Sequence, residues 1–204
     1  MRRVPLMNLQ HYYDWLFRQN SNGSGIPLKE TGLVVGALLL LAHLGFWMGG
    51  EKSIGFVKNF PRHRAWGIAL LLVDSIWGFF LVQHMDMGEF YHWRERLMIL
   101  VPVTFLLVSV FVPEFLAVRA LGAMMLMAAA PVLQAAFLQP QTSRLLLPIL
   151  AYAWIIAGMF FVGMPYLLRD WINWVTQNKA RWNLAVFGGA AYGALILVVA
   201  LMDY

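Results

Sequence analysis

The amino-acid sequence predicts an all-α fold, that of a polytopic integral membrane protein whose six transmembrane helices form an antiparallel bundle. Of its 204 residues, 61% are hydrophobic and only 12% are charged, which leaves more apolar surface than a water-soluble core could hide. Six charge-poor runs are close to the roughly 20 residues that a spanning helix needs. They are residues 32–50, 65–85, 97–112, 115–138, 145–168 and 183–202.

Helices are expected in these runs because hydrocarbon offers no water to pair with backbone N–H and C=O groups. A closed β-barrel also pairs its backbone groups, but its strands alternate between apolar and polar residues. The six runs lack that alternation. The third and fourth runs are separated only by Val112, Pro113 and Glu114, which predicts a tight antiparallel hairpin.

The segment before the first run predicts an amphipathic helix. Over residues 8–19, Leu9, Tyr12, Tyr13, Leu16 and Phe17 fall on one stripe of a helix, with polar residues opposite. The segment is too short and polar to span, so we expect it to lie in the headgroup layer. Docking on a partner subunit is the alternative. The chain therefore divides into residues 1–29, an amphipathic segment with a flexible linker, and residues 30–204, the six-helix domain.

The charge and the absence of cysteine limit the classes of binding partner and of chemistry that we expect. The net charge of +5 comes from basic residues that flank the apolar runs, where they meet anionic lipid headgroups. We therefore expect membrane lipids and possible further membrane subunits as partners, and no nucleic acid. The chain contains no cysteine, which excludes disulfides and thiol chemistry. We place it as a multi-pass protein in a bacterial inner (cytoplasmic) membrane.

The loops predict an orientation. Those after the first, third and fifth runs carry Lys52, Lys58, Arg62, Arg64, Arg169, Lys179 and Arg181, whereas the opposite loops carry Arg94, Arg96 and Arg144. The positive-inside rule places the first set in the cytoplasm and both termini outside. The basic residues before the first run, Arg2 and Arg3 among them, argue the other way.

Four polar residues inside the runs are the candidate site: His43, Asp74, Arg119 and Gln134. Each lies on a helix face that carries small residues and should point into the bundle. At 1.5 Å per residue, His43 and Asp74 lie about 16 and 12 Å from opposite surfaces, close to one level. A buried carboxylate needs a partner, so we expect Arg119 to reach Asp74 directly or through water.

This intramembrane polar cluster has two main interpretations, and a third is that Asp74 faces a partner subunit instead. As a functional site, it binds a polar headgroup or carries protons. As a structural element, it is a hydrogen-bonded lock that fixes helix packing, with Arg119 anchored at the surface. Helix packing itself is expected at four glycines, because small residues let two backbones approach closely. These are Gly32, Gly36, Gly189 and Gly193.

Catalytic and metal-binding signals are weak. Glu89 and His92 have the E-x-x-H spacing of carboxylate-bridged metal sites, but such sites use two of these motifs and only one is present. A solvated loop is the simpler interpretation. His43, His84 and His92 lie at different depths, which argues against a haem held by two histidines. We expect no cofactor.

Two functional hypotheses follow. The first is a non-catalytic integral membrane protein that serves as a scaffold or accessory subunit of a membrane complex. The alternative is a small transporter or a lipid- or quinone-binding bundle that uses the His43, Asp74 and Arg119 cluster. Catalytic residues are not assigned, since no protease, pump or hydroxylase motif of recognised spacing occurs.

Overall fold

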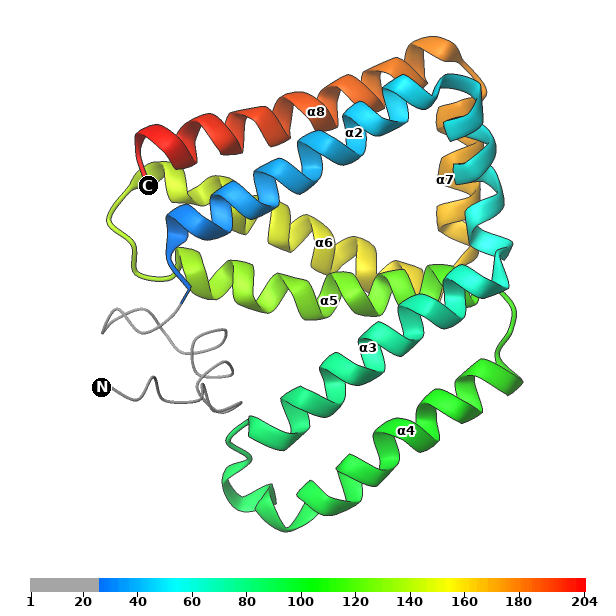
Figure 1. The fold of residues 1–204 in the computed structure, drawn as a ribbon, viewed down its shortest axis with the longest axis vertical. Coiled ribbons are helices and arrows are strands. Elements are labelled where there is room, and N and C mark those ends of the chain that lie inside the picture. The colour runs from blue at the N-terminus through cyan, green and yellow to red at the C-terminus, as the bar shows by residue number, and fades with distance from the viewer. Residues whose placement is uncertain (1–25) are drawn as a thin grey trace, which may run out of the picture.

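The computed structural model describes residues 26–204, and all of its regular elements are helical (Figure 1). The predicted amphipathic segment at residues 8–19 lies outside the described residues. The α-helices are α2 (Leu28–Asn59), α3 (Arg64–His84), α4 (Arg94–Phe111), α5 (Leu116–Ala136), α6 (Leu146–Gly163), α7 (Tyr166–Thr176) and α8 (Lys179–Met202). Short 3-10 helices η2 (Phe60–Arg62), η3 (Gly88–Trp93) and η4 (Thr142–Leu145) connect some of them.

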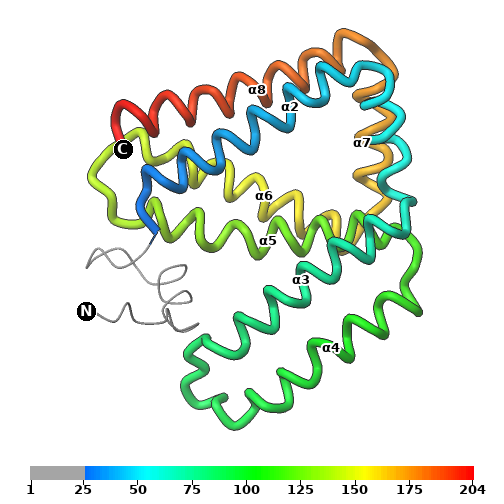
Figure 2. Tube along the Cα trace, in the orientation of Figure 1, coloured from blue at the N-terminus to red at the C-terminus, as the bar shows by residue number. Residues whose placement is uncertain are grey.

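The long helices pack as antiparallel pairs. Helix α2 lies along α8, and α5 lies along α6. Helix α3 packs on α5, and α4 packs on the outer side of α3. Figure 2 shows that the α2–α8 and α5–α6 pairs approach each other near the C-terminus and diverge toward α7, which crosses the wide end.

Five helices are long and apolar enough to cross a membrane. These candidate spans are Leu28–Arg62, Arg64–His84, Leu116–Ala136, Thr142–Gly163 and Lys179–Met202. The sixth expected span, residues 97–112, falls in α4 and is not among them. Helix α4 has 18 residues, and its first turn holds Arg94, Glu95 and Arg96, which shortens its apolar part. The all-helical prediction is confirmed, whereas a sixth span stays a prediction.

At two places the helices end at other residues than the apolar runs do. The run at 145–168 is broken because α6 ends at Gly163 and Pro165 precedes α7. Proline restricts the residue before it away from helical geometry, and Met164 accordingly leaves the helix. The first run ends at Gly50, yet the helix continues to Asn59 after a kink there. Gly50 has φ of 51°, which a residue without a Cβ adopts at little cost.

Glycines stand where the backbones come closest. A Cβ on Gly193 of α8 would lie 2.7 Å from the backbone nitrogen of Leu40 in α2, and one on Gly36 would lie 3.0 Å from the Gly193 carbonyl oxygen. Across the α5–α6 contact, Gly122 and Gly158 face each other in the same way. Side chains at these positions would push the helices apart, so the glycines set the distance between them.

The core of the bundle lies where its two central pairs meet. Buried apolar residues of α2, α5, α6 and α8 form one cluster, which includes Val35, Val132, Leu147 and Ile196. Two tyrosine hydroxyls join α8 and the residues after it to the start of α6 and to η4. Tyr192 donates to the Leu146 carbonyl oxygen at 2.8 Å, and Tyr204 donates to that of Ser143 at 2.7 Å.

The Tyr204 hydroxyl remains a donor over a wide pH range. Burial, together with the negative charge of Asp203 and the nearby Tyr192, raises the pKa of Tyr204 to about 12. Its ring also closes over Gly32, where a Cβ would come within 3.1 Å of it. The end of the chain is therefore tied to both α2 and η4.

Replacing Gly193 with leucine should destabilise the α2–α8 contact. The new side chain would collide with backbone at Leu40, and overpacking of this kind costs about 1–3 kcal/mol. The matched control is Gly188→Leu in the same helix, where no heavy atom lies within 4 Å of an added Cβ. We expect a lower melting temperature in detergent for Gly193→Leu alone. Equal melting temperatures for the two variants would contradict the contact.

Candidate functional site

His43 lies in the α2–α8 contact. Its Nδ1 donates to the Leu39 carbonyl oxygen at 2.7 Å, one turn earlier in the same helix. The other side of the ring covers Gly189 of α8, where a Cβ would overlap the imidazole. The Phe46 ring meets His43 edge to face, with centroids 6.3 Å apart. His43 therefore packs as a flat group against a glycine of the neighbouring helix.

Arg119 links α5 to α6. It lies in the first turn of α5, and its guanidinium donates to the Val162 carbonyl oxygen at 2.9 Å. That carbonyl belongs to the last turn of α6, whose final four C=O groups have no partner within the helix. A cation in this position also complements the negative end of the helix dipole. Arg119 thus serves the α5–α6 contact.

Asp74 is the most isolated polar group of the described residues. It lies in the middle of α3, its exposed fraction is only 7%, and neither carboxylate oxygen has a hydrogen-bond partner. The expected direct pair with Arg119 is not formed, because the guanidinium is turned toward α6. His43 is on α2, which packs on α8, whereas α3 packs on α5 and α4. The direct form of the expected cluster is therefore absent, and contact through water stays a prediction.

Gln134 lies far from Arg119 on the same helix. It follows Arg119 by fifteen residues on α5, which corresponds to about 22 Å along the helix. Its Oε1 is buried without a hydrogen-bond partner, so it makes no hydrogen bond to the other expected polar residues through that atom. The four glycines, by contrast, are brought together: Gly32 and Gly36 on α2 face α8, and Gly189 and Gly193 on α8 face α2.

A cavity borders Asp74 between α3, α4 and α5. Its volume is about 310 Å³, and its walls are mainly apolar, with Leu100, Phe105 and Met127 among them. Besides Asp74, the hydroxyl-bearing residues Ser75 and Thr104 line it. The Ser75 hydroxyl already donates to the Leu71 carbonyl oxygen at 2.8 Å. The cavity is thus an apolar space with one carboxylate in its wall.

Sequence patterns did not reveal this cavity or the Gly122–Gly158 contact. The cavity depends on α4 as its outer wall, and no residue of α4 is buried to mark an inward face. Gly122 and Gly158 are isolated glycines on separate helices, each without a second small residue four positions away that would make a packing motif. Their pairing becomes visible only when the two helices are placed together.

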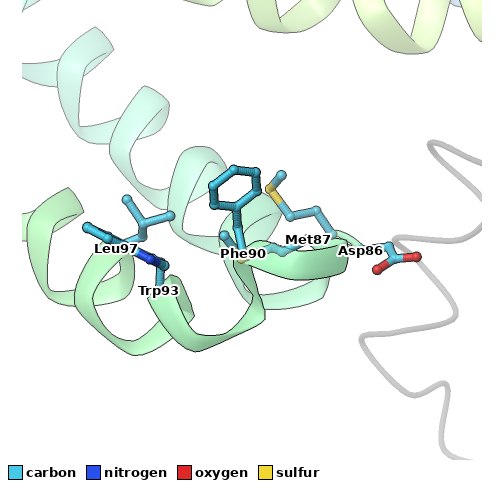
Figure 3. A pocket seen from close by; sticks show the side chains of 6 residues that line it. Asp86, Met87, Phe90, Trp93 and Leu97 are labelled. Carbon is cyan, nitrogen blue, oxygen red and sulfur yellow. The ribbon is translucent and has the colours of Figure 1, made fainter.

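Two further apolar pockets lie at the ends of helices. One, of about 430 Å³, lies at the turn between α3 and α4, where Figure 3 shows Met87, Phe90, Trp93 and Leu97. The other, of about 480 Å³, lies between α6 and α7 and is lined by Phe160, Phe161, Leu167 and Trp171, among others. Neither pocket carries a constellation of polar groups.

The weak metal candidates, Glu89 and His92, are both exposed in η3. Within residues 26–204, no group of three or more His, Cys, Asp or Glu side chains is placed to hold a metal ion. No family model, curated protein or solved structure matches the chain.

Asp74 and Arg119 should respond to mutation in opposite directions. Asp74→Leu removes a buried carboxyl group without a partner, and apolar replacement of such groups is often stabilising. Arg119→Leu removes a charge-assisted bond to Val162, which is worth about 1.5–3 kcal/mol. We expect a raised melting temperature in detergent for the first variant and a lowered one for the second. A large loss of stability in Asp74→Leu would indicate a partner that the structure does not contain.

Proposed function

We propose that the chain is a multi-pass protein of a bacterial inner membrane with a non-catalytic role, as a scaffold or accessory subunit of a membrane complex. The observation that carries this proposal is the outward apolar surface of α4. None of its residues is buried, and apolar side chains such as Ile99, Val110 and Phe111 are exposed, Phe111 by 75%. A helix with this surface needs lipid or a partner protein around it rather than water.

The distribution of charge supports a position across a membrane. Seven basic residues belong to the elements at the end of the bundle that α7 crosses, which are the part of α2 beyond Gly50, η2, the start of α3, α7 itself and the start of α8. They are Lys52, Lys58, Arg62, Arg64, Arg169, Lys179 and Arg181. Arg181 lies over the Trp174 ring, 4.5 Å from its centroid. Basic and tryptophan side chains together suit the headgroup layer of a cytoplasmic leaflet.

Helix α7 supports the same arrangement. It is an amphipathic helix of eleven residues, with Ile172 buried and Trp171 and Trp174 exposed. It runs across the ends of the long helices (Figure 1). A short amphipathic helix in this direction is suited to the plane of the membrane surface. The part of α2 beyond Gly50 lies next to it.

The scaffold role is favoured over the transporter alternative. A transporter was expected to use His43, Asp74 and Arg119 together, and these residues lie in separate helix contacts. The lipid- or quinone-binding alternative retains one observation in its favour, the apolar pocket between α6 and α7. That pocket has the size of small-molecule sites but lacks the placed polar groups that orient a ligand.

Single cysteines test the membrane topology cleanly, since the chain has none of its own. We expect a membrane-impermeant maleimide to label Glu89→Cys in intact cells, and Lys58→Cys only after the membrane is permeabilised. Ile156→Cys, on the exposed face of α6, should resist labelling in both conditions because lipid surrounds it. Labelling of Glu89→Cys and Lys58→Cys from the same side would contradict the topology.

Photocrosslinking tests the scaffold role. A benzophenone maleimide placed at Val110→Cys on α4 should give one protein adduct of defined mass in native membranes. The control is Leu184→Cys on α8, a residue that is also exposed but belongs to the tightly packed α2–α8 pair. We expect lipid adducts alone from that position. Lipid adducts alone from Val110→Cys as well would argue against a partner on α4.

A further inference from the structure

Asp74 stands out because nothing in the described fold compensates its charge. It lies about 12 Å along α3 from Trp66 and about 15 Å from His84, far from both ends of the helix. Its carboxylate oxygens have no hydrogen-bond partner, and its exposed fraction is 7%. A carboxylate in these surroundings needs a proton or a cation, because an uncompensated buried charge is among the most costly features of a fold.

The nearest parts of the structure do not supply that cation. Arg119 of α5 donates to the Val162 carbonyl oxygen. Arg94, the first residue of α4, donates to the Met85 carbonyl oxygen at 2.6 Å and lies over the Tyr91 ring. Within residues 26–204, Asp74 forms no ion pair. Among the described residues, therefore, no side chain supplies the positive charge, which leaves a proton or a bound cation as the compensating group.

We propose that the cavity between α3, α4 and α5 binds a lipophilic cation, an apolar molecule with one positive charge, and that Asp74 is its counter-charge. The volume of about 310 Å³ is at the lower end of small-molecule sites. Its walls are apolar apart from Asp74, Ser75 and Thr104. The Phe105 ring in the wall adds an aromatic face, which attracts cations.

The same lining argues against an inorganic cation. Ions such as calcium take about six to eight oxygen ligands, and magnesium takes six at near-ideal octahedral positions. The cavity offers the Asp74 carboxylate and two hydroxyl-bearing residues, and the Ser75 hydroxyl is engaged with Leu71. An organic cation needs fewer oxygens because its apolar groups are satisfied by the leucine, phenylalanine and methionine side chains.

Helix α4 provides a route into the cavity. It forms the outer wall without a single buried residue, and Pro102 lacks the N–H that would complete its helical hydrogen bonding. A second cavity, of about 280 Å³, lies on the other side of the α3–α4 contact and shares Ser75, Val101 and Phe105 with the first. The two helices therefore touch along a narrow strip. In this proposal, a lipophilic cation reaches the cavity from the hydrocarbon beside that strip.

The test compares two probes of the same size and opposite charge, tetraphenylphosphonium and tetraphenylborate. Binding is measured by calorimetry on the full chain purified in mild detergent. We expect the wild-type protein to bind the cation and not the anion. Asp74→Asn should weaken cation binding by at least about tenfold, a change that corresponds to loss of one charge interaction. Asp74→Glu should retain binding, and Glu95→Gln, which removes an exposed carboxylate of α4, should not alter it.

Ala123→Phe provides a second variant that keeps the carboxylate and fills the cavity from the α5 side. It should also weaken cation binding. If Asp74→Asn does not fold, this variant tests whether the cation binds in the cavity. Three results would overturn the proposal. They are no binding of tetraphenylphosphonium to the wild-type protein, equal binding of the borate, and unchanged cation affinity in folded Asp74→Asn or Ala123→Phe.

Discussion

Close approach of helix backbones at glycines is the constraint on which the rest of this structure depends. Helices surrounded by lipid gain little from the hydrophobic effect when they associate, so dispersion contacts between closely spaced backbones must hold them. Gly36 with Gly193 provides this contact for α2 and α8, and Gly122 with Gly158 provides it for α5 and α6. Gly67 places α3 against the backbone of Ala117 at the start of α5. Helix α4 has no glycine and no buried residue, and it is the outermost helix.

The sequence was sufficient to predict the helices but not their pairing. Hydropathy identified the apolar runs, because a long uncharged stretch satisfies its own backbone only as a helix. A helical face tells which way His43 and Gly36 point, yet it does not tell which helix they meet. We expected His43 and Asp74 to share one cluster inside the bundle. Instead α2 packs on the last helix of the chain, and its glycine-bearing face receives Gly193.

The prediction of where helices end was limited for a different reason. Gly50 and Pro165 lie within or beside apolar sequence, so hydropathy alone does not predict a break in the helix at either residue. The left-handed conformation at Gly50 and the break before Pro165 turn two segments across the end of the bundle. The isolation of Asp74 could not be predicted either, since it depends on where Arg119 points. A carboxylate without a partner in a fold held by apolar contacts is a local inconsistency, and such inconsistencies concentrate at functional sites.

The divergence of the two central pairs leaves one end of their four helices narrow and the other end wide. They are joined near the C-terminus by the apolar cluster and by the two tyrosine hydroxyls, and they separate toward α7 (Figure 2). At the narrow end the pairs hold each other by direct contact of side chains. At the wide end α7 contacts α2, α6 and α8, so it is the element that bridges the gap between them.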